Sequence, residues 1–304
     1  MTVPGASATT AILTIGHGTV DALEELPAFL AVIRRGHAPP VELVAEVRRR
    51  YEAIGGRSPL NDICRELTRR VGERMAVPAA FAGRLWGPKP DVILADLARH
   101  GVTRVVVLPL AQHSARLYVD AVRAAAETVG AKVDVLGPEN WGQHPALTTA
   151  FASSLTKALA LVPEGIRPRT RVLMTAHSLP LAVVRSGDPY EAEVRASARA
   201  VASAVGAAML PHEVIFQSQG MGGGEWLGPD VESTLSRLAS EGVKHVLFAP
   251  TGFLADHVEV LYDLDIEARG WAEAHGMTYG RMVSLNAGDG LVDALEAVAR
   301  GVLA

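Results

Sequence analysis

The segment VLFAP at residues 246–250 is a short apolar run that stops abruptly at a proline. A run of this kind is typical of a strand that is buried on both faces of a parallel sheet. It is followed at 253–267 by FLADHVEVLYDLDIE, in which apolar and acidic residues recur with helical spacing. Open α/β sheets bind ligands beyond the carboxyl ends of their strands, so the start of this helix is expected to lie at a site.

Three carboxylates recur at every fourth position of this helical segment, namely Glu259, Asp263 and Glu267. On an α-helix these positions form one column on one face. No lysine is interleaved with them, so the like charges repel each other. A solvated acidic face is the alternative explanation, but the location after a strand end favours oxygen ligands for a divalent cation.

Further apolar runs rich in Val, Ile and Leu alternate with helical segments along the chain. They lie at residues 11–15, 105–109, 132–136 and 171–175. Short apolar strands that alternate with helices predict an α/β fold with parallel sheets and crossover helices.

The two halves of the chain resemble each other. Residues 97–105 are similar to 238–246, and each segment leads into a strand that ends in proline. Residues 12–17 are similar to 172–177, and both segments end in histidine. Two Rossmann-like domains related by internal duplication, with a ligand cleft between them, explain these similarities. Chance likeness of two common β-α patterns is the alternative.

The domain boundary is expected near residue 145, after a loop rich in turn-forming residues. The first domain would then span 1–145 and the second 146–289. The last helix, within 290–304, is expected to pack back on the first domain.

The composition limits the functional classes. The chain has 304 residues, 49% of them hydrophobic and 20% charged, with a net charge of -4. An acidic balance with scattered arginines argues against a nucleic-acid partner. No apolar run approaches the roughly 18 residues of a membrane span, and residues 1–10 lack the pattern of a secretory signal. Cys64 is the only cysteine, which excludes an internal disulfide or an iron–sulfur cluster held by four thiolates of one chain. A cytoplasmic location is expected.

Histidines stand at strand ends in both halves. His177 closes one predicted strand, His17 occupies the matching position, and His113 follows a third strand with weaker support. A hydrogen-bonded structural role is the alternative for each of them. Neutral imidazole is a ligand for iron, cobalt, nickel and zinc, and its pKa suits proton transfer. Glu259 is expected to face His177 across a slot wide enough for a flat macrocycle.

A basic zone punctuated by glycines covers 33–36, 48–51 and 55–59. Solvated helix faces explain some of its arginines, and recognition of carboxylates by guanidinium groups and a hydroxyl is the functional interpretation. Residues 217–230 are glycine-rich but lack the ending of a phosphate-binding loop. This stretch is interpreted as a lid or wall of the cleft.

Along nearly its whole length the chain resembles ferrochelatases of the bacterial kind that metallate coproporphyrin. The motifs that carry this resemblance, in order, are YEAIGG at 51–56, SPL at 58–60, AHSLP at 176–180, GDPY at 187–190, WLGPD at 226–230, GF at 252–253 and DHVEVLYD at 256–263. So many motifs in one order make a specific signal.

The resemblance implies chelatase-type domains with a porphyrin cleft and insertion of Fe²⁺ during haem biosynthesis. His177 matches the inner histidine that binds metal and accepts protons, and Glu259 matches its facing carboxylate. Asp263 and Glu267 match outer carboxylates along the metal route. Fe²⁺ is then a substrate, and no permanently bound cofactor is expected.

In the same way, Arg34, Arg50, Tyr51 and Ser58 fall on positions that contact the propionates and rim of the porphyrin. Trp141 matches a tryptophan that lines the cleft. The resemblance also implies a porphyrin partner, coproporphyrin III above all, and a haem-pathway enzyme that receives the product.

The chain departs from the family at His17, where a tyrosine is usual. In the coproporphyrin branch that tyrosine can coordinate the product iron, and an imidazole would bind iron more strongly, retain the product or alter the choice of metal. Residues near Gly142, and the pair Gln112 and His113, also differ from the usual pattern. Two alternatives therefore stay open. One is a chelatase of the same fold for cobalt, nickel or another tetrapyrrole, which the paired His17 and His177 favour slightly, and the other is a non-catalytic haem- or metal-binding protein descended from a chelatase.

Overall fold

The computed structural model describes residues 9–220 and 224–304. The chain divides into two compact units. The first comprises Met1–Ala45, Pro59–Trp141 and Val292–Ala304, and the second comprises Glu46–Ser58 and Gly142–Leu291. Residues 1–8, where no secretory signal is expected, and 221–223 of the expected lid lie outside the described residues.

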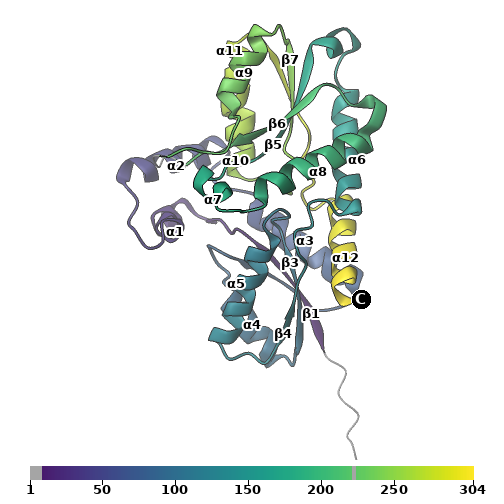
Figure 1. The fold of residues 1–304 in the computed structure, drawn as a ribbon. Helices are drawn as coiled ribbons and strands as arrows, with labels where there is room; N and C mark the ends of the chain where they lie inside the picture. Colours follow the sequence, from purple (N-terminus) through teal and green to yellow (C-terminus); the bar gives the residue numbers. More distant parts are fainter. Residues whose placement is uncertain (1–8, 221–223) are drawn as a thin grey trace, which may run out of the picture. The chain divides into compact units, whose positions relative to one another are not determined.

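The first unit contains a four-stranded parallel sheet with the order β2-β1-β3-β4 (Figure 1). Its strands are β1 (Thr10–Gly16), β2 (Ala79–Gly83), β3 (Arg104–Pro109) and β4 (Asp134–Leu136). Its helices are η1 (Leu23–Glu25), α1 (Leu26–Ile33), α3 (Leu60–Met75), α4 (Pro90–Arg99), α5 (Ala115–Thr128) and most of α12 (Asp289–Leu303). Helix α2 (Val41–Ala53) begins in the first unit and ends in the second.

Side chains that alternate along β1 cover the two faces of this first sheet. Ala11, Leu13 and Ile15 join a buried cluster with residues of α4 and α5. On the opposite face, the hydroxyls of Thr14 and Thr68 meet, which joins β1 to α3. The central strand is therefore buried on both sides, as expected for a parallel sheet.

The second unit repeats this plan with the strand order β6-β5-β7-β8, again all parallel. Its strands are β5 (Thr170–His177), β6 (His212–Gln217), β7 (His245–Ala249) and β8 (Thr278–Arg281). Its helices are α6 (Pro145–Ala160), η2 (Glu164–Arg169), α7 (Leu181–Arg185), α8 (Tyr190–Val205), η3 (Gly206–Ala208), α9 (Val231–Ser240), α10 (Val258–Leu261), the π-helix η4 (Asp263–Ala268) and α11 (Arg269–Ala274).

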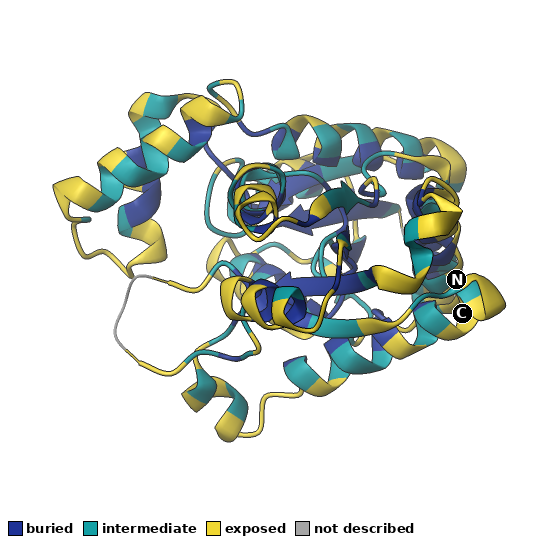
Figure 2. Ribbon diagram, turned by 90° about the horizontal axis from the view of Figure 1, so that it is seen from above, coloured by how far each residue is buried: buried dark blue, intermediate teal, exposed yellow. Residues whose placement is uncertain are grey.

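The second sheet is also covered on both faces. Leu173 and Phe248 pack with α9, η4 and α11 on one side. Ala176 and Phe216 pack with α8 on the other side. Figure 2 shows the result as dark blue strands between helices whose outer faces are yellow. Burial of this kind stabilises a domain by about 25 cal/mol per Å² of apolar surface.

The two sheets have the same strand order, and the repeated sequence segments fall on matching elements. Residues 12–17 belong to β1 and its end, and 172–177 belong to β5. The pair 97–105 and 238–246 leads into β3 and β7, which have the same place in their sheets. The expected α/β fold with two similar parallel sheets is confirmed.

The observed units differ in detail from the expected domains. Residues 46–58 group with the second unit, although the expected first domain spans 1–145. Residues 292–304 group with the first unit. In the described part of the chain, no helix combines the length and apolarity needed to cross a membrane.

Candidate functional site

His177 is the last residue of β5, and its main chain is held by buried neighbours. The Tyr190 hydroxyl donates to the His177 carbonyl over 3.0 Å, and Ser178 Oγ donates to the Leu227 carbonyl over 2.8 Å. A buried strand that ends in a fixed loop places the imidazole at the carboxyl edge of the second sheet, where α/β folds bind ligands.

Gly252, in the loop after β7, supports the same strand end. Its amide donates to the Thr175 carbonyl over 2.8 Å. A Cβ at this position would lie 2.4 Å from the Ala176 Cβ and 2.5 Å from its Cα. The loop after β7 therefore approaches the chain before His177 so closely that it requires glycine.

His177 and Glu259 are in direct contact. The distance between His177 Nδ1 and Glu259 Oε2 is 3.0 Å, and the side chains are 38% and 35% exposed. The expectation that a slot for a flat macrocycle separates them is wrong, because they form one hydrogen-bonded pair. Since Nδ1 is used, Nε2 is the ring nitrogen that can accept a proton from a substrate.

The acidic segment is not the continuous α-helix that its spacing predicts. It begins as α10, and from Asp263 to Ala268 it becomes the π-helix η4. The Glu267 amide donates to the Tyr262 carbonyl over 3.0 Å, five residues earlier. Such wide turns are rare and frequently occur at functional sites.

Asp263, the middle carboxylate, is relieved by a cation from another element. Arg50 Nη1, at the end of α2, lies 3.2 Å from Asp263 Oδ1. Ser218 Oγ, just after β6, donates a hydrogen bond to Asp263 Oδ2. The sequence indicated no compensating charge because Arg50 lies more than two hundred residues away. Arg50 also pairs with Glu46 over 2.7 Å.

These contacts shift the protonation of the site. Burial lowers the pKa of His177, but the charges of Glu259 and Asp263 and the hydrogen bond to Glu259 outweigh it, so the net shift is upward. Burial would raise the pKa of Glu259, but His177 and His257 hold it well below its usual value. Burial and repulsion by Glu259 raise the pKa of Asp263 to about 7. Burial likewise raises the pKa of Glu267.

Three further residues lie at this site that were not predicted from the sequence. Gln217, the last residue of β6, donates from Nε2 to the Glu259 carbonyl over 2.6 Å. Ser218 holds Asp263, as described above. His257 Nε2 lies 3.8 Å from Glu259 Oε2. Gln217 ends β6 and Ser218 directly follows it, so recognition of this strand in the sequence would have identified both residues by the same strand-end rule.

The residues expected to contact a porphyrin divide between the two units. Tyr51 and Ser58 belong to the second unit with Arg50, and both are buried, at 2% and 4% exposure. In the first unit, Arg34 is exposed at the end of α1, whereas Trp141 is buried. The Trp141 indole N–H donates to the Pro109 carbonyl over 3.0 Å, which fixes the ring within its own unit.

His17 lies just beyond β1 in the first unit. It is exposed, and its Nδ1 is 3.4 Å from the Tyr118 hydroxyl, which is long for a hydrogen bond. Gln112 and His113 are buried instead of lining an open surface, and burial lowers the pKa of His113 to about 4.

The described side chains do not form a closed metal site. In residues 9–220 and 224–304, no three His, Cys, Asp or Glu side chains converge closely enough to hold a metal ion. His177 and Glu259 offer one imidazole nitrogen and carboxylate oxygens at an open edge. Structural metal sites use a closed ligand set, whereas sites that exchange ligands stay open. The arrangement suits transient contact with a cation.

The comparisons with known proteins agree over nearly the whole chain. A profile described as Ferrochelatase matches residues 9–302. A ferrochelatase of Herpetosiphon aurantiacus is 33% identical, with 97% of this chain and 99% of that protein covered. A ferrochelatase of Acidobacterium capsulatum is 36% identical over 96% of this chain and 94% of that protein. A coproporphyrin III ferrochelatase of Geobacillus kaustophilus is 32% identical, with 95% of each chain covered.

A solved structure shares the fold at lower sequence identity. The sirohydrochlorin chelatase SirB of Bacillus subtilis, in complex with cobalt, superposes with a TM-score of 0.52 at 16% identity, covering 97% of this chain and 95% of that one. One conclusion follows from the family profile, from the sequence identity to relatives that are covered over nearly their whole length, and from the two similar parallel sheets. The chain belongs to the ferrochelatase family.

Proposed function

We propose that the protein inserts Fe²⁺ into coproporphyrin III, with His177 and Glu259 as the residues that act on the reacting centre. The observation that carries this proposal is their 3.0 Å contact at the carboxyl edge of the second sheet. An imidazole whose second nitrogen is available, backed by an ionised carboxylate, is a base placed where α/β folds bind ligands.

The pair has the properties that metal insertion needs. A free-base porphyrin must lose its two pyrrole N–H protons before a cation can bind among the four nitrogens. His177 Nε2 accepts a proton, and the low pKa of Glu259 keeps that carboxylate charged, which stabilises the imidazolium. Because the imidazole is 38% exposed, it can pass each proton to water and accept the next. Distortion of the ring by binding elsewhere would expose the nitrogen lone pairs.

Asp263 and Glu267 would deliver the metal ion. They follow Glu259 along the same segment and offer hard oxygen ligands, which bind a hydrated divalent cation without trapping it. Arg50 now neutralises Asp263 at 3.2 Å, so an arriving cation would replace one positive charge with another. The column would therefore exchange Fe²⁺ more easily than an unpaired acidic cluster.

The substrate carboxylates would be recognised by the basic zone. Arg34 is exposed, and its guanidinium is the candidate to bind a propionate. Further contacts with the porphyrin are proposed for Tyr51, Ser58 and Trp141. Arg50 could serve a propionate only by leaving Glu46 and Asp263. Coproporphyrin III carries more propionates than protoporphyrin IX, and relatives named for coproporphyrin III support this choice of substrate.

A second candidate function is a haem or metal carrier that does not turn over. His17 favours it, because an exposed imidazole binds iron more strongly than a neutral phenol and would retain the product. In the enzyme, the same residue would coordinate product iron until a haem-pathway partner collects it, which fits a cytoplasmic pathway. A cobalt or nickel chelatase is less favoured, because relatives at 30% identity or more are named for iron.

The decisive experiment incubates the protein anaerobically with Fe²⁺, Co²⁺ or Zn²⁺ and with coproporphyrin III or protoporphyrin IX. Loss of the free-base absorption bands measures insertion. We expect the fastest reaction with Fe²⁺ and coproporphyrin III. If no pair reacts faster than it does without protein, the enzyme proposal fails, and co-purified, tightly held haem without turnover would establish the carrier.

Two histidine variants separate chemistry from stability. His177→Ala is expected to lower insertion by about 100-fold or more while porphyrin binding persists. His245→Ala is the matched control. His245 is the first residue of β7, whereas His177 is the last residue of β5, so the two histidines lie at opposite edges of the parallel sheet. The Nδ1 atom of His245 lies 2.8 Å from Thr278 Oγ1. An equal loss in both variants would contradict the assignment of His177.

A further inference from the structure

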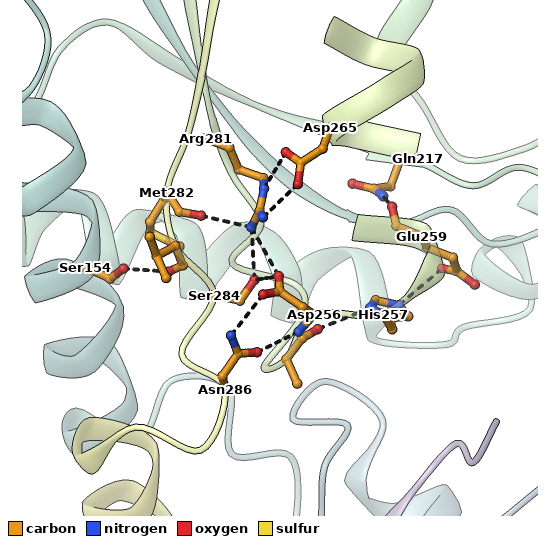
Figure 3. Close-up of polar contacts among 12 residues, drawn as sticks. Ser154, Gln217, Asp256, His257, Glu259, Asp265, Arg281, Met282, Ser284 and Asn286 are labelled. Atoms are coloured by element: carbon orange, nitrogen blue, oxygen red, sulfur yellow. Dashed lines mark hydrogen bonds and ion pairs between the residues drawn. The ribbon is translucent and has the colours of Figure 1, made fainter. Parts of the chain in front are cut away.

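A second polar cluster lies beside the acidic segment and is centred on Arg281, the last residue of β8 (Figure 3). Its guanidinium binds Asp265 through both oxygens, with Nε–Oδ1 at 2.7 Å and Nη2–Oδ2 at 2.8 Å. Its Nη1 donates to Asp256 Oδ1 over 3.2 Å. The Arg281 side chain is 14% exposed. A planar guanidinium that binds two carboxylates in so buried a position is a specific and rigid arrangement.

The rest of the cluster fixes Asp256. Ser284 Oγ donates to Asp256 Oδ1 over 2.6 Å, and Asn286 Nδ2 donates to Oδ2 over 2.9 Å. The Asp256 amide in turn donates to Asn286 Oδ1 over 2.8 Å. Both carboxylate oxygens and the main chain of Asp256 are therefore held by the segment that follows β8.

The two carboxylates mark two points of the functional segment. Asp256 stands just before α10, and Asp265 lies within η4. Glu259 and Asp263 lie between them in the sequence. In Figure 3 the Glu259 side chain points away from the guanidinium of Arg281. The Arg281 guanidinium thus binds one residue on each side of Glu259 and Asp263, within the segment that places these two carboxylates at the site.

The π-helical turn explains why the segment needs contacts of this kind to hold its shape. A π-turn spans one more residue per hydrogen bond than an α-turn and persists where other contacts hold it. Asp265 is in this turn, and the Tyr279 hydroxyl donates to it over 3.0 Å in addition to the Arg281 fork. Without Arg281, Asp256 and Asp265 would lose their cationic partner on a segment that already carries Glu259, Asp263 and Glu267.

We infer that Arg281 is a positioning residue for metal insertion, which holds the α10–η4 segment so that the Glu259 carboxylate meets His177. The inference rests on the proposed function, because it assigns Arg281 to the same reaction. Arg281 acts through the segment and does not touch the reacting atoms. Metal-site residues lose activity when their supporting contacts are removed, typically by about 10–100-fold.

The test compares Arg281→Gln with Arg237→Gln. Arg237 is the matched control, because it also pairs with two carboxylates of the second unit, Glu213 and Glu241, away from the acidic segment. We expect Arg281→Gln to lower kcat by about 10–100-fold and to raise KM for Fe²⁺, with KM for the porphyrin unchanged. Arg237→Gln is expected to retain wild-type values.

A second readout does not depend on turnover. Hydrogen exchange of peptides covering 258–268 is expected to be about tenfold faster in Arg281→Gln than in the wild type or Arg237→Gln. Unchanged exchange, or unchanged kinetics for Fe²⁺, would overturn the role of Arg281. If the wild type inserts no metal, the proposed function fails by itself, while the exchange data still decide whether Arg281 holds the segment.

Two further variants distinguish position from charge. If Arg281→Gln does not fold, Arg281→Lys keeps the charge but loses the fork, and an intermediate loss of kcat is expected. Wild-type kcat in Arg281→Lys would overturn the inference. Combining Arg281→Gln with Asp265→Asn removes one unpaired carboxylate. Activity restored to wild type in that double variant would show that charge balance alone matters and would also overturn it.

Discussion

Replacing Asp263 with asparagine is expected to stabilise the protein above neutral pH while it impairs metal insertion. The Asp263 side chain is 8% exposed, and its pKa is raised from 3.8 to about 7 by burial and by Glu259. The ionised carboxylate is therefore unfavourable in the folded state. Such a cost is tolerated at a functional site when the charge is needed for cation binding.

The sign of the pH dependence follows from proton binding. Between about pH 4 and pH 7, unfolded Asp263 has lost its proton while folded Asp263 still holds it. The free energy of unfolding therefore falls as the pH rises through this window, and the stability that this group contributes at low pH is lost above about pH 7. A shift of about three units corresponds to about 4 kcal/mol.

The asparagine variant should escape most of this loss. The amide of the variant resembles the protonated carboxyl. However, its NH₂ group takes the place of one of the two carboxylate oxygens that accept from Arg50 and Ser218, and the lost hydrogen bond costs about 1–2 kcal/mol. We therefore expect Asp263→Asn to exceed the wild type by about 2–3 kcal/mol near pH 8 and to have no advantage near pH 4.

Urea unfolding followed by circular dichroism, at several pH values between about 5 and 8, measures this difference. Asp120→Asn is the control, because Asp120 is a 53% exposed carboxylate that pairs with Arg123 on the surface, and its effect should stay within about 0.5 kcal/mol at every pH. A gap between Asp263→Asn and the wild type that is independent of pH would refute the reasoning. So would a variant that is less stable near pH 8.

Three further outcomes are expected. Glu259→Gln should lower the pKa of His177, because the charge of Glu259 and its hydrogen bond raise that pKa. The acidic limb of the pH–rate profile for metal insertion should therefore move to lower pH. An unmoved limb would mean that another group titrates. Gly252→Ala should lower the free energy of unfolding by about 1–3 kcal/mol and reduce insertion, because its Cβ would overlap Ala176 beside His177; wild-type urea midpoints would contradict the close approach. His113→Gln should flatten the acid side of the stability curve. The pKa of His113 is lowered from 6.5 to about 4, so as the pH falls from about 6.5 to 4 the wild type loses up to about 3 kcal/mol that the variant keeps; parallel curves in pH-dependent urea unfolding would refute this.

The strand pattern was largely readable from the sequence because buried parallel strands are continuous apolar runs. The runs at 11–15, 105–109, 171–175 and 246–250 are the two central strands of each sheet. The edge strand β2 escaped notice because AAFAG is short and made of small residues, and β8 because TYGR is polar and half-exposed. Edge strands lack the two-sided burial that produces a clear signal.

The acidic segment shows where periodicity fails. Carboxylates at every fourth position predicted one α-helical face, and the residues do belong to one helical segment. The change from α10 to η4 was not predictable from local spacing, because the contacts of Asp265 within η4 come from Arg281 and Tyr279, on a strand later in the chain. Local spacing cannot reveal an unusual turn that distant side chains stabilise.

By itself, the sequence determined the α/β class, the internal repeat, and the strand-end placement of His177 and Glu259, because apolar runs and their abrupt ends depend on local composition. Only the tertiary structure decided how those groups interact. It joined His177 to Glu259 in a hydrogen bond, brought Arg50 to Asp263, and buried Tyr51 and Ser58. The physical reason is that distances, burial and pKa values depend on neighbours from distant parts of the chain, which no local pattern encodes.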